Sequence, residues 1–275
     1  MRIVERALRF GCLASALLAA GACRREPALT VDTSVRRVVP VESPATRPLP
    51  GIAFPRPDRR VASIVSASWD DEDARDRAGE ADSVMSLLAI VAGMGVADIG
   101  AGSGYYAVRL SRRVGPSGRV YAEDITPAYL SDLRKRIGKD SINSRNRGND
   151  ATTFGNIDVI LGTPDNPRLP QASVDRALLV HMYHEITQPY ALLYNLFPAL
   201  KPGSRVGVVD VDRPTSSHGT PPALLKCEMS AAGYDQVEFH TLEVGYLAVF
   251  APVKQRSPGE VSAAIERPGF NQRRC

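Results

Sequence analysis

The chain has 275 residues and a mass of 29.7 kDa, which suits one α/β domain with appendages, or at most two small domains. Hydrophobic residues make up 44% and charged residues 23%, as in a globular protein with a buried core. The formal net charge is +4, but the excess arginines lie near both ends and form no helix-long basic stripe with interleaved aromatics. We therefore predict no nucleic-acid binding. No pair among the four cysteines has zinc-ligand spacing, and no disulfide framework is predicted.

The first 23 residues have the pattern of an export signal. Arg2, Arg6 and Arg9 precede the apolar run 10–22, which is too short to span a bilayer and ends in small residues suited to cleavage. Cys23 follows at once, which resembles a lipoprotein signal, whose lipidated cysteine would tether the protein to a membrane. A simple cleaved signal is the alternative. Both readings predict an exported protein, either periplasmic or membrane-anchored, in preference to a cytoplasmic one.

Three regions are predicted to contain neither helix nor strand. Residues 24–57 are rich in proline and arginine, and proline excludes helix and disfavours a central strand, so we predict an extended tether. The polar stretch 139–155 is predicted to be a loop, and the polar residues 254–275 a disordered tail. The folded domain is expected at 58–253.

Within that domain, helical and strand patterns alternate. Strands are predicted at 96–99, 119–123, 157–161, 174–180, 205–210, 234–243 and 246–250, and helices at 81–91, 105–114, 127–137, 187–200 and 221–232. Alternation of this kind predicts an α/β fold with a mostly parallel sheet and helices on both faces. The final strand pair implies one antiparallel strand.

The strongest local signal is a glycine-rich loop at 98–105, with the sequence Asp-Ile-Gly-Ala-Gly-Ser-Gly-Tyr. It follows the first strand and opens a helix, where glycines let the backbone approach a ligand and the helix N-terminus directs N–H groups toward it. An acid pair, Glu123 and Asp124, ends the second strand, where an acid in nucleotide-binding folds binds ribose hydroxyls.

The details of this loop favour one class of nucleotide over others. A dehydrogenase needs a small residue at the position of Tyr105, and the lysine–serine pair of a nucleoside triphosphatase is absent. Asp98 stands two residues ahead of the glycines. Its carboxylate suits a cationic ligand, such as a sulfonium or an amino-acid ammonium, better than a pyrophosphate.

Four segments together resemble the motifs of class I S-adenosylmethionine (SAM)-dependent methyltransferases: 98–104, 120–127, 175–186 and 200–204. They occur in the family's order and span about residues 80–251. The chain most resembles bacterial predicted methyltransferases that carry signal peptides and a DIGAGxGYY loop. The resemblance implies a Rossmann-like sheet of seven strands with the last strand antiparallel, SAM as cofactor, and methyl transfer as activity.

The resemblance also implies roles for particular residues. Gly100, Gly102 and Gly104 would lie against the methionine part of SAM, with Asp98 beside its ammonium group. Asp124 would bind the ribose hydroxyls, with Glu123 as the alternative, because neighbouring residues face opposite sides of a strand. Relatives often place an acid after the third strand to contact adenine, and here Thr163 or Asp165 would take that place.

Residues after the fourth strand are the candidates for chemistry. We expect His184 to act as a base or substrate contact and Tyr183 to line the pocket, although a histidine here could instead cap a helix. His181 and His184 are three residues apart with no third ligand in view, so no metal site is predicted.

Three functions are compatible with the sequence. The first is an active methyltransferase with a small-molecule acceptor, which the order of the motifs favours. The second is an NAD-dependent oxidoreductase, against which Tyr105 argues. The third is an inactive, exported binding protein, which the signal keeps open because SAM is made in the cytoplasm. The sequence reveals neither the methyl acceptor nor the oligomeric state.

Overall fold

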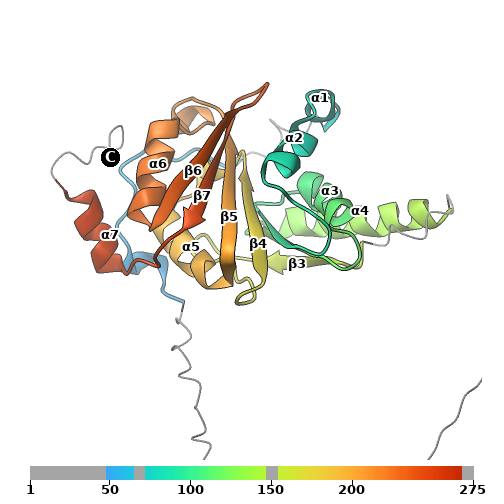
Figure 1. Cartoon of the computed structure of the whole chain (residues 1–275), viewed down its shortest axis with the longest axis horizontal. Helices are drawn as coiled ribbons and strands as arrows, with labels where there is room; N and C mark the ends of the chain where they lie inside the picture. Colours follow the sequence, from blue (N-terminus) through green and yellow to red (C-terminus); the bar gives the residue numbers. More distant parts are fainter. Residues whose placement is uncertain (1–47, 65–71, 147–153, 268–275) are drawn as a thin grey trace, which may run out of the picture. The chain divides into compact units, whose positions relative to one another are not determined.

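The computed structural model describes residues 48–64, 72–146 and 154–267 (Figure 1). All of them belong to one compact unit that comprises residues 44–275. The predicted export signal with Cys23, and the tether as far as residue 47, lie outside the described residues. In the part of the chain that is described, no helix is long and apolar enough to cross a membrane.

A seven-stranded sheet forms the centre of this unit, with the strand order β3-β2-β1-β4-β5-β7-β6. Strand β7 runs antiparallel to both β5 and β6, and the other neighbouring pairs are parallel. The predicted Rossmann-like sheet with an antiparallel last strand is therefore confirmed. The strands are β1 (Gly95–Ile99), β2 (Arg119–Asp124), β3 (Ile157–Leu161), β4 (Val174–Val180), β5 (Leu200–Asp210), β6 (Tyr234–Thr241) and β7 (Tyr246–Pro252).

Helices cover both faces of the sheet, as the alternating pattern predicted (Figure 1). The α-helices are α1 (Glu72–Arg77), α2 (Glu80–Leu87), α3 (Tyr105–Val114), α4 (Pro127–Asn146), α5 (Pro189–Leu196), α6 (Pro222–Ala231) and α7 (Pro258–Ile265). One apolar core joins α2, α3 and α4 to the sheet, and a second joins α5, α6 and α7 to the opposite face.

Period-two alternation along the central strands divides their side chains between these two cores. In β1, Val96 packs in the core with α3, and its neighbour Ala97 packs in the core with α5. In β4, Leu178 and Leu179 divide in the same way. Strands buried on both faces read as continuous apolar runs, which is why both were recognisable in the sequence.

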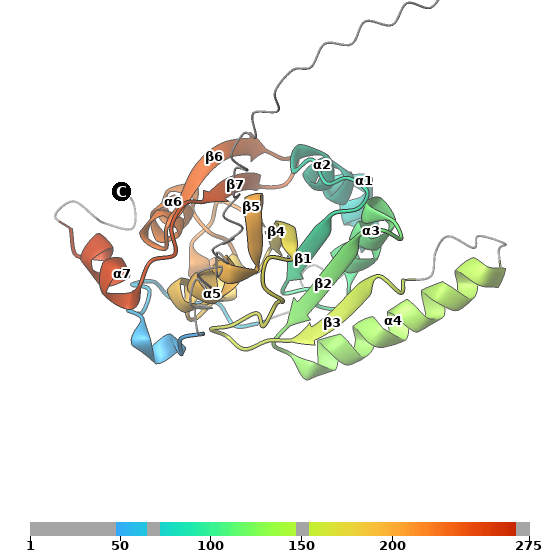
Figure 2. The same cartoon turned by 60° about the horizontal axis from the view of Figure 1, so that its bottom comes forward.

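Helix α4 is longer than the sequence predicted. It extends to Asn146, whereas 139–155 was expected to be a loop, and in Figure 2 it runs beside β3. Its first turns are fixed by the buried side chains of Leu130 and Leu133. The later residues are polar, which by itself predicts a loop, but a helix anchored at one end can continue beyond the surface on which it packs.

Both predicted ends of the domain also need correction. Residues from 48 onward pack on the domain: Gly51 begins a short 3-10 helix (Gly51–Ala53), and Phe54 is buried. At the other end α7 forms within the expected tail. Ser257 and Glu260 make a reciprocal capping box, and Val261 is 1% exposed.

One cysteine also departs from the expectation of no disulfide framework. Cys227 in α6 is buried and disulfide-bonded.

Candidate functional site

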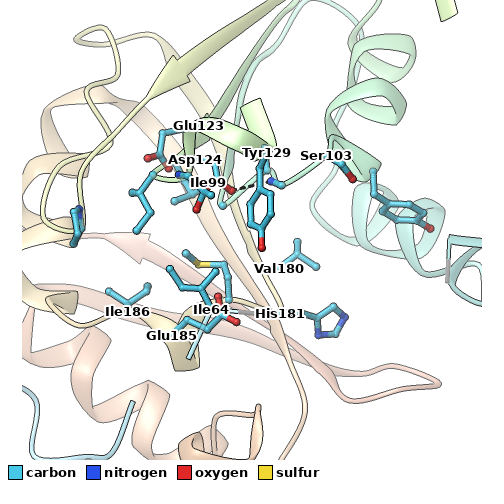
Figure 3. A pocket seen from close by; sticks show the side chains of 18 of the residues that line it. Ile64, Ile99, Ser103, Glu123, Asp124, Tyr129, Val180, His181, Glu185 and Ile186 are labelled. Atoms are coloured by element: carbon cyan, nitrogen blue, oxygen red, sulfur yellow. Dashed lines mark hydrogen bonds between the residues drawn. The ribbon is translucent and has the colours of Figure 1, made fainter. Parts of the chain in front are cut away.

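A cavity of about 360 Å³ opens at the carboxyl ends of β1, β2 and β4, the edge where open α/β sheets bind ligands (Figure 3). Its wall combines the glycine loop, the acids that end β2, the segment after β4, and residues from α1 and the preceding chain. Of the residues predicted for the site, Gly100, Gly102, Glu123, Asp124 and Thr163 line it.

The glycine loop is held in a shape that L residues rarely adopt. Gly102 has φ of +54° and Gly104 φ of +93°. An added Cβ on Gly102 would meet nothing within 4 Å, whereas one on Gly104 would collide with the side chain of Leu133 in α4. Gly102 therefore belongs to the cavity wall, and Gly104 permits close packing of the loop against α4 rather than contact with a ligand.

The two acids at the end of β2 have different surroundings. Asp124 accepts a hydrogen bond from the N–H of Gly102 at 2.9 Å and another from the N–H of Thr126 at 2.7 Å, so it fixes the loop that faces it. Glu123 is 2% exposed, and its Oε1 has no hydrogen-bond partner among the described residues. Burial and the charge of Asp124 raise the pKa of Glu123 to about 8.

Asp98 lies behind the loop at the end of β1. It is 3% exposed, and its Oδ2 makes no hydrogen bond within the described structure. Burial raises the pKa of Asp98 to about 7, although the positive charge of Arg75 opposes the shift. A buried carboxylate with one oxygen left without a hydrogen bond favours a cationic neighbour.

Arg75 is a wall residue that the sequence reasoning missed. It comes from α1, its guanidinium lies 3.8 Å from the centre of the Tyr105 ring, and it forms an ion pair with Glu80 at 2.7 Å. A guanidinium held by an aromatic face and one carboxylate can also bind the carboxylate of an amino-acid ligand.

The opposite half of the cavity comes from the segment after β4. Figure 3 shows Glu185 and Ile186 across the cavity from Glu123 and Asp124. His181 also lines this half, and its Nε2 lies 3.0 Å from Oε2 of Glu80. Burial alone would raise the pKa of Glu80, but the hydrogen bond from His181 and the charges of His181 and Arg75 bring it to about 2.

The structure places the two predicted catalytic residues away from the cavity wall. Tyr183 is completely buried, with the guanidinium of Arg59 5.5 Å from its ring centre, and burial raises its pKa well above the ordinary value. Tyr183 is therefore not the lining residue that we expected. His184 is 1% exposed and directs Nδ1 toward Asp210 at 3.0 Å. Both belong to a short 3-10 helix, η3 (Tyr183–Glu185), which turns the neighbouring Glu185 toward the cavity instead.

The predicted adenine contacts separate in the structure. Thr163 lines the cavity, but Asp165 does not. One Asp165 oxygen accepts from the N–H of Gly51 at 2.8 Å, and the other accepts from the hydroxyl of Thr163 at 2.6 Å. Asp165 therefore links the short 3-10 helix that begins at Gly51 to the loop after β3. No pattern in the sequence indicates this role.

Comparisons with known proteins agree with this fold. Residues 97–208 match the family described as methyltransferase domain. The ubiquinone/menaquinone biosynthesis C-methyltransferase UbiE of Pseudomonas putida is 24% identical over 206 residues, covering 62% of this chain and 76% of that protein. The arsenite methyltransferase of Halobacterium salinarum is 26% identical over 181 residues, covering 64% of this chain and 43% of that protein. The solved structure of a SAM-dependent methyltransferase from Aquifex aeolicus has a TM-score of 0.57 at 21% identity, covering 66% of this chain and 93% of that one.

Residues 97–208 are thus a methyltransferase domain, and the relatives and the fold together support a SAM-dependent methyltransferase. The groups around its glycine loop fit SAM, which carries a positive sulfonium and a zwitterionic amino acid. Asp98 and Glu123 each have a buried oxygen without a partner among the described residues, and Gly102 leaves open space above the loop. This methyltransferase would hold SAM at the glycine-loop half of the cavity, where SAM supplies an electrophilic methyl group.

Proposed function

We propose that this methyltransferase transfers the methyl group of SAM to a small, largely apolar acceptor bound in the second half of the cavity. The proposal rests on a wall of aliphatic side chains that lines this cavity together with the acids of β2. The apolar wall consists of Ile64, Val180, Met182, Ile186 and Leu192. Because both halves belong to one cavity, an acceptor there lies within reach of a methyl group held over the glycine loop.

Alignment supplies most of the catalysis in this proposal. The acceptor atom would form its bond to the methyl carbon supplied by SAM as the carbon–sulfur bond breaks, and the acceptor would give up a proton. Glu185 is the carboxylate at the acceptor half that can take this proton. His181 helps to shape the same half through its contact with Glu80.

The similarity to UbiE, a C-methyltransferase of ubiquinone and menaquinone biosynthesis, supports a quinone-like acceptor. An apolar ring fits a wall of aliphatic side chains better than an ion does. For arsenite, soft thiolate ligands are preferred, and the cavity wall contains no cysteine among the described residues. We therefore expect methylation of a demethylated quinol and none of arsenite, measured by transfer of radiolabelled methyl groups from SAM. Methylation of arsenite alone would contradict this choice of acceptor.

Titration calorimetry tests the cofactor half independently of the acceptor. Purified protein should bind SAM and S-adenosylhomocysteine with micromolar affinity and should not bind NAD. Asp124→Ala should abolish binding, because Asp124 fixes the backbone of Gly102. A folded protein that binds neither SAM nor S-adenosylhomocysteine would favour the inactive binding protein, for which the comparisons give no support.

We further propose that the protein is exported, with Cys23 as the site of a lipid anchor. Support comes from the pattern of residues 1–23, with its arginines, short apolar run and small residues before Cys23. Cell fractionation should find the protein in the membrane fraction, and Cys23→Ala should release it. A full-length, unprocessed protein in the cytoplasm would contradict export and would remove the question of how SAM reaches it.

A further inference from the structure

We propose that His184, Glu185 and His218 form a binding site for a divalent transition-metal ion at the edge of the cavity. The sequence reasoning paired His184 with His181 and found no third ligand. In the structure His181 faces Glu80 instead, and the second histidine is His218, from the loop after β5. One ligand atom from each of the three residues lies within 4.8 Å of the other two.

The surroundings of His184 orient its ring so that Nε2 is available to bind a metal. Asp210 is fully buried, and its two oxygens accept hydrogen bonds from the N–H of Val211 at 2.9 Å and the hydroxyl of Thr220 at 2.7 Å. Nδ1 of His184 lies 3.0 Å from the same carboxylate. Because a carboxylate only accepts, Nδ1 carries the hydrogen, and the lone pair of a neutral ring is on Nε2. Metal-binding histidines commonly have such a carboxylate behind them.

Nε2 of His184 points toward the other proposed ligand from η3. It lies 3.9 Å from Oε1 of Glu185, the carboxylate that also lines the cavity. A cation held between these two residues would therefore lie beside the acceptor half of the cavity, where an acceptor oxygen or nitrogen could reach it.

His218 is brought to this place by a strained and anchored loop. Its backbone has φ of +54° and ψ of +61°, in the left-handed region that residues other than glycine adopt at an energetic cost. The loop is fastened on both sides of His218: the hydroxyl of Thr215 donates to the carbonyl of Arg60, and the N–H of Thr220 to the carbonyl of Val211 at 2.9 Å. The His218 ring then meets the His184 ring edge-on, with their centres 5.4 Å apart.

Two imidazoles and one carboxylate suit zinc and the neighbouring divalent ions of the first transition row. Ligands about 2.0–2.2 Å from a metal lie roughly 3.3 Å apart in a tetrahedral site, so the three groups must move closer by up to about 1.5 Å. Glu185 and His218 are partly exposed and can make this adjustment, while His184 stays fixed by Asp210. Three protein ligands leave at least one coordination position open.

Metal binding can be measured without any assumption about the acceptor or about SAM. We would titrate the untagged full chain, freed of metal with a chelator, with Co²⁺ and record its visible absorption, which reports nitrogen and oxygen ligands. Glu185→Gln and His218→Ala remove ligands, and Asp210→Asn removes only the carboxylate behind His184. His240→Ala is the matched control, because His240 also lies beside a carboxylate, 2.8 Å from Glu238, but on the exposed strand β6.

The expected result is one Co²⁺ per chain, displaced by Zn²⁺. The affinity should fall at least tenfold in Glu185→Gln and His218→Ala, by about ten- to a hundredfold in Asp210→Asn, and not at all in His240→Ala. Absence of stoichiometric binding by the folded wild-type protein would overturn the proposal, and so would retention of full affinity in both ligand variants. Circular dichroism identifies a variant that fails to fold; Glu185→Gln then decides, because its partly exposed side chain tolerates the amide.

Discussion

The sharpest prediction concerns Asp98→Asn, which should stabilise the SAM-free protein while weakening its binding of SAM. Asp98 is buried beside the glycine loop, and one of its oxygens has no partner in the described structure. Burial raises its pKa from the ordinary 3.8 to about 7. A neutral asparagine of the same shape avoids the cost of a buried charge and also removes the charge that a cationic ligand would meet.

The size of the expected stability difference follows from the pKa shift of Asp98. About three pKa units correspond to roughly 4 kcal/mol, at about 1.4 kcal/mol per unit. Since the folded pKa is higher than the unfolded one, the folded state holds the proton of Asp98 more tightly. Its contribution to stability is therefore present below about pH 4 and is lost as the pH rises through about 7. The free energy of unfolding of Asp98→Asn should accordingly exceed that of the wild type by up to about 4 kcal/mol at pH 8, and by much less at pH 4.

Urea denaturation of both proteins without SAM, at pH 4 to 8, measures this difference directly. Titration calorimetry with SAM at pH 7.5 supplies the second readout, in which the variant should bind at least tenfold more weakly. Parallel pH profiles for the two proteins would refute the reasoning, because they would mean that Asp98 ionises equally in the folded and unfolded states. Unchanged SAM affinity would separately refute the placement of Asp98 near the ammonium group.

Three further predictions test other parts of the structure. Asp124→Asn should reduce the affinity for SAM at least tenfold in calorimetry, because it disturbs the hydrogen bond to Gly102. Glu123→Gln should reduce the affinity less, and the reverse order would make Glu123 the ribose acid. Gly104→Ala should lower the free energy of unfolding by more than 1 kcal/mol in urea, because φ is +93° and its Cβ meets Leu133. Ser257→Ala should cost about 1 kcal/mol through the lost capping box, whereas a disordered tail would show no change.

The sheet and the cofactor half of the site could be predicted because their signals are local. β1 and the glycine loop are consecutive in the chain, and the acids of β2 follow after one helix. A buried parallel strand is a continuous apolar run, and a loop with positive φ requires glycine, so both leave marks on neighbouring residues.

The acceptor half could not be predicted because its geometry depends on contacts between distant segments. Arg59, from the chain before α1, binds the carbonyls of Tyr183 and Ile186. These bonds hold η3 so that its first two residues are buried and Glu185 reaches the cavity. Periodicity in the sequence places the three residues of η3 just after β4 but cannot predict which of their side chains turns toward the cavity. The capping box at Ser257 is different, because Ser-Pro-x-Glu is a local signal that could have predicted α7.

Two buried carboxyls beside the glycine loop would attract a positively charged ligand. Asp98 and Glu123 have pKa values raised by burial, and the charge of Asp124 raises both further. A positive charge nearby favours the ionised form of such groups, and the attraction is greatest where water is excluded. The ammonium and the sulfonium of bound SAM would both contribute to this attraction. Loss of the sulfonium charge on methyl transfer would weaken it, which would favour release of S-adenosylhomocysteine.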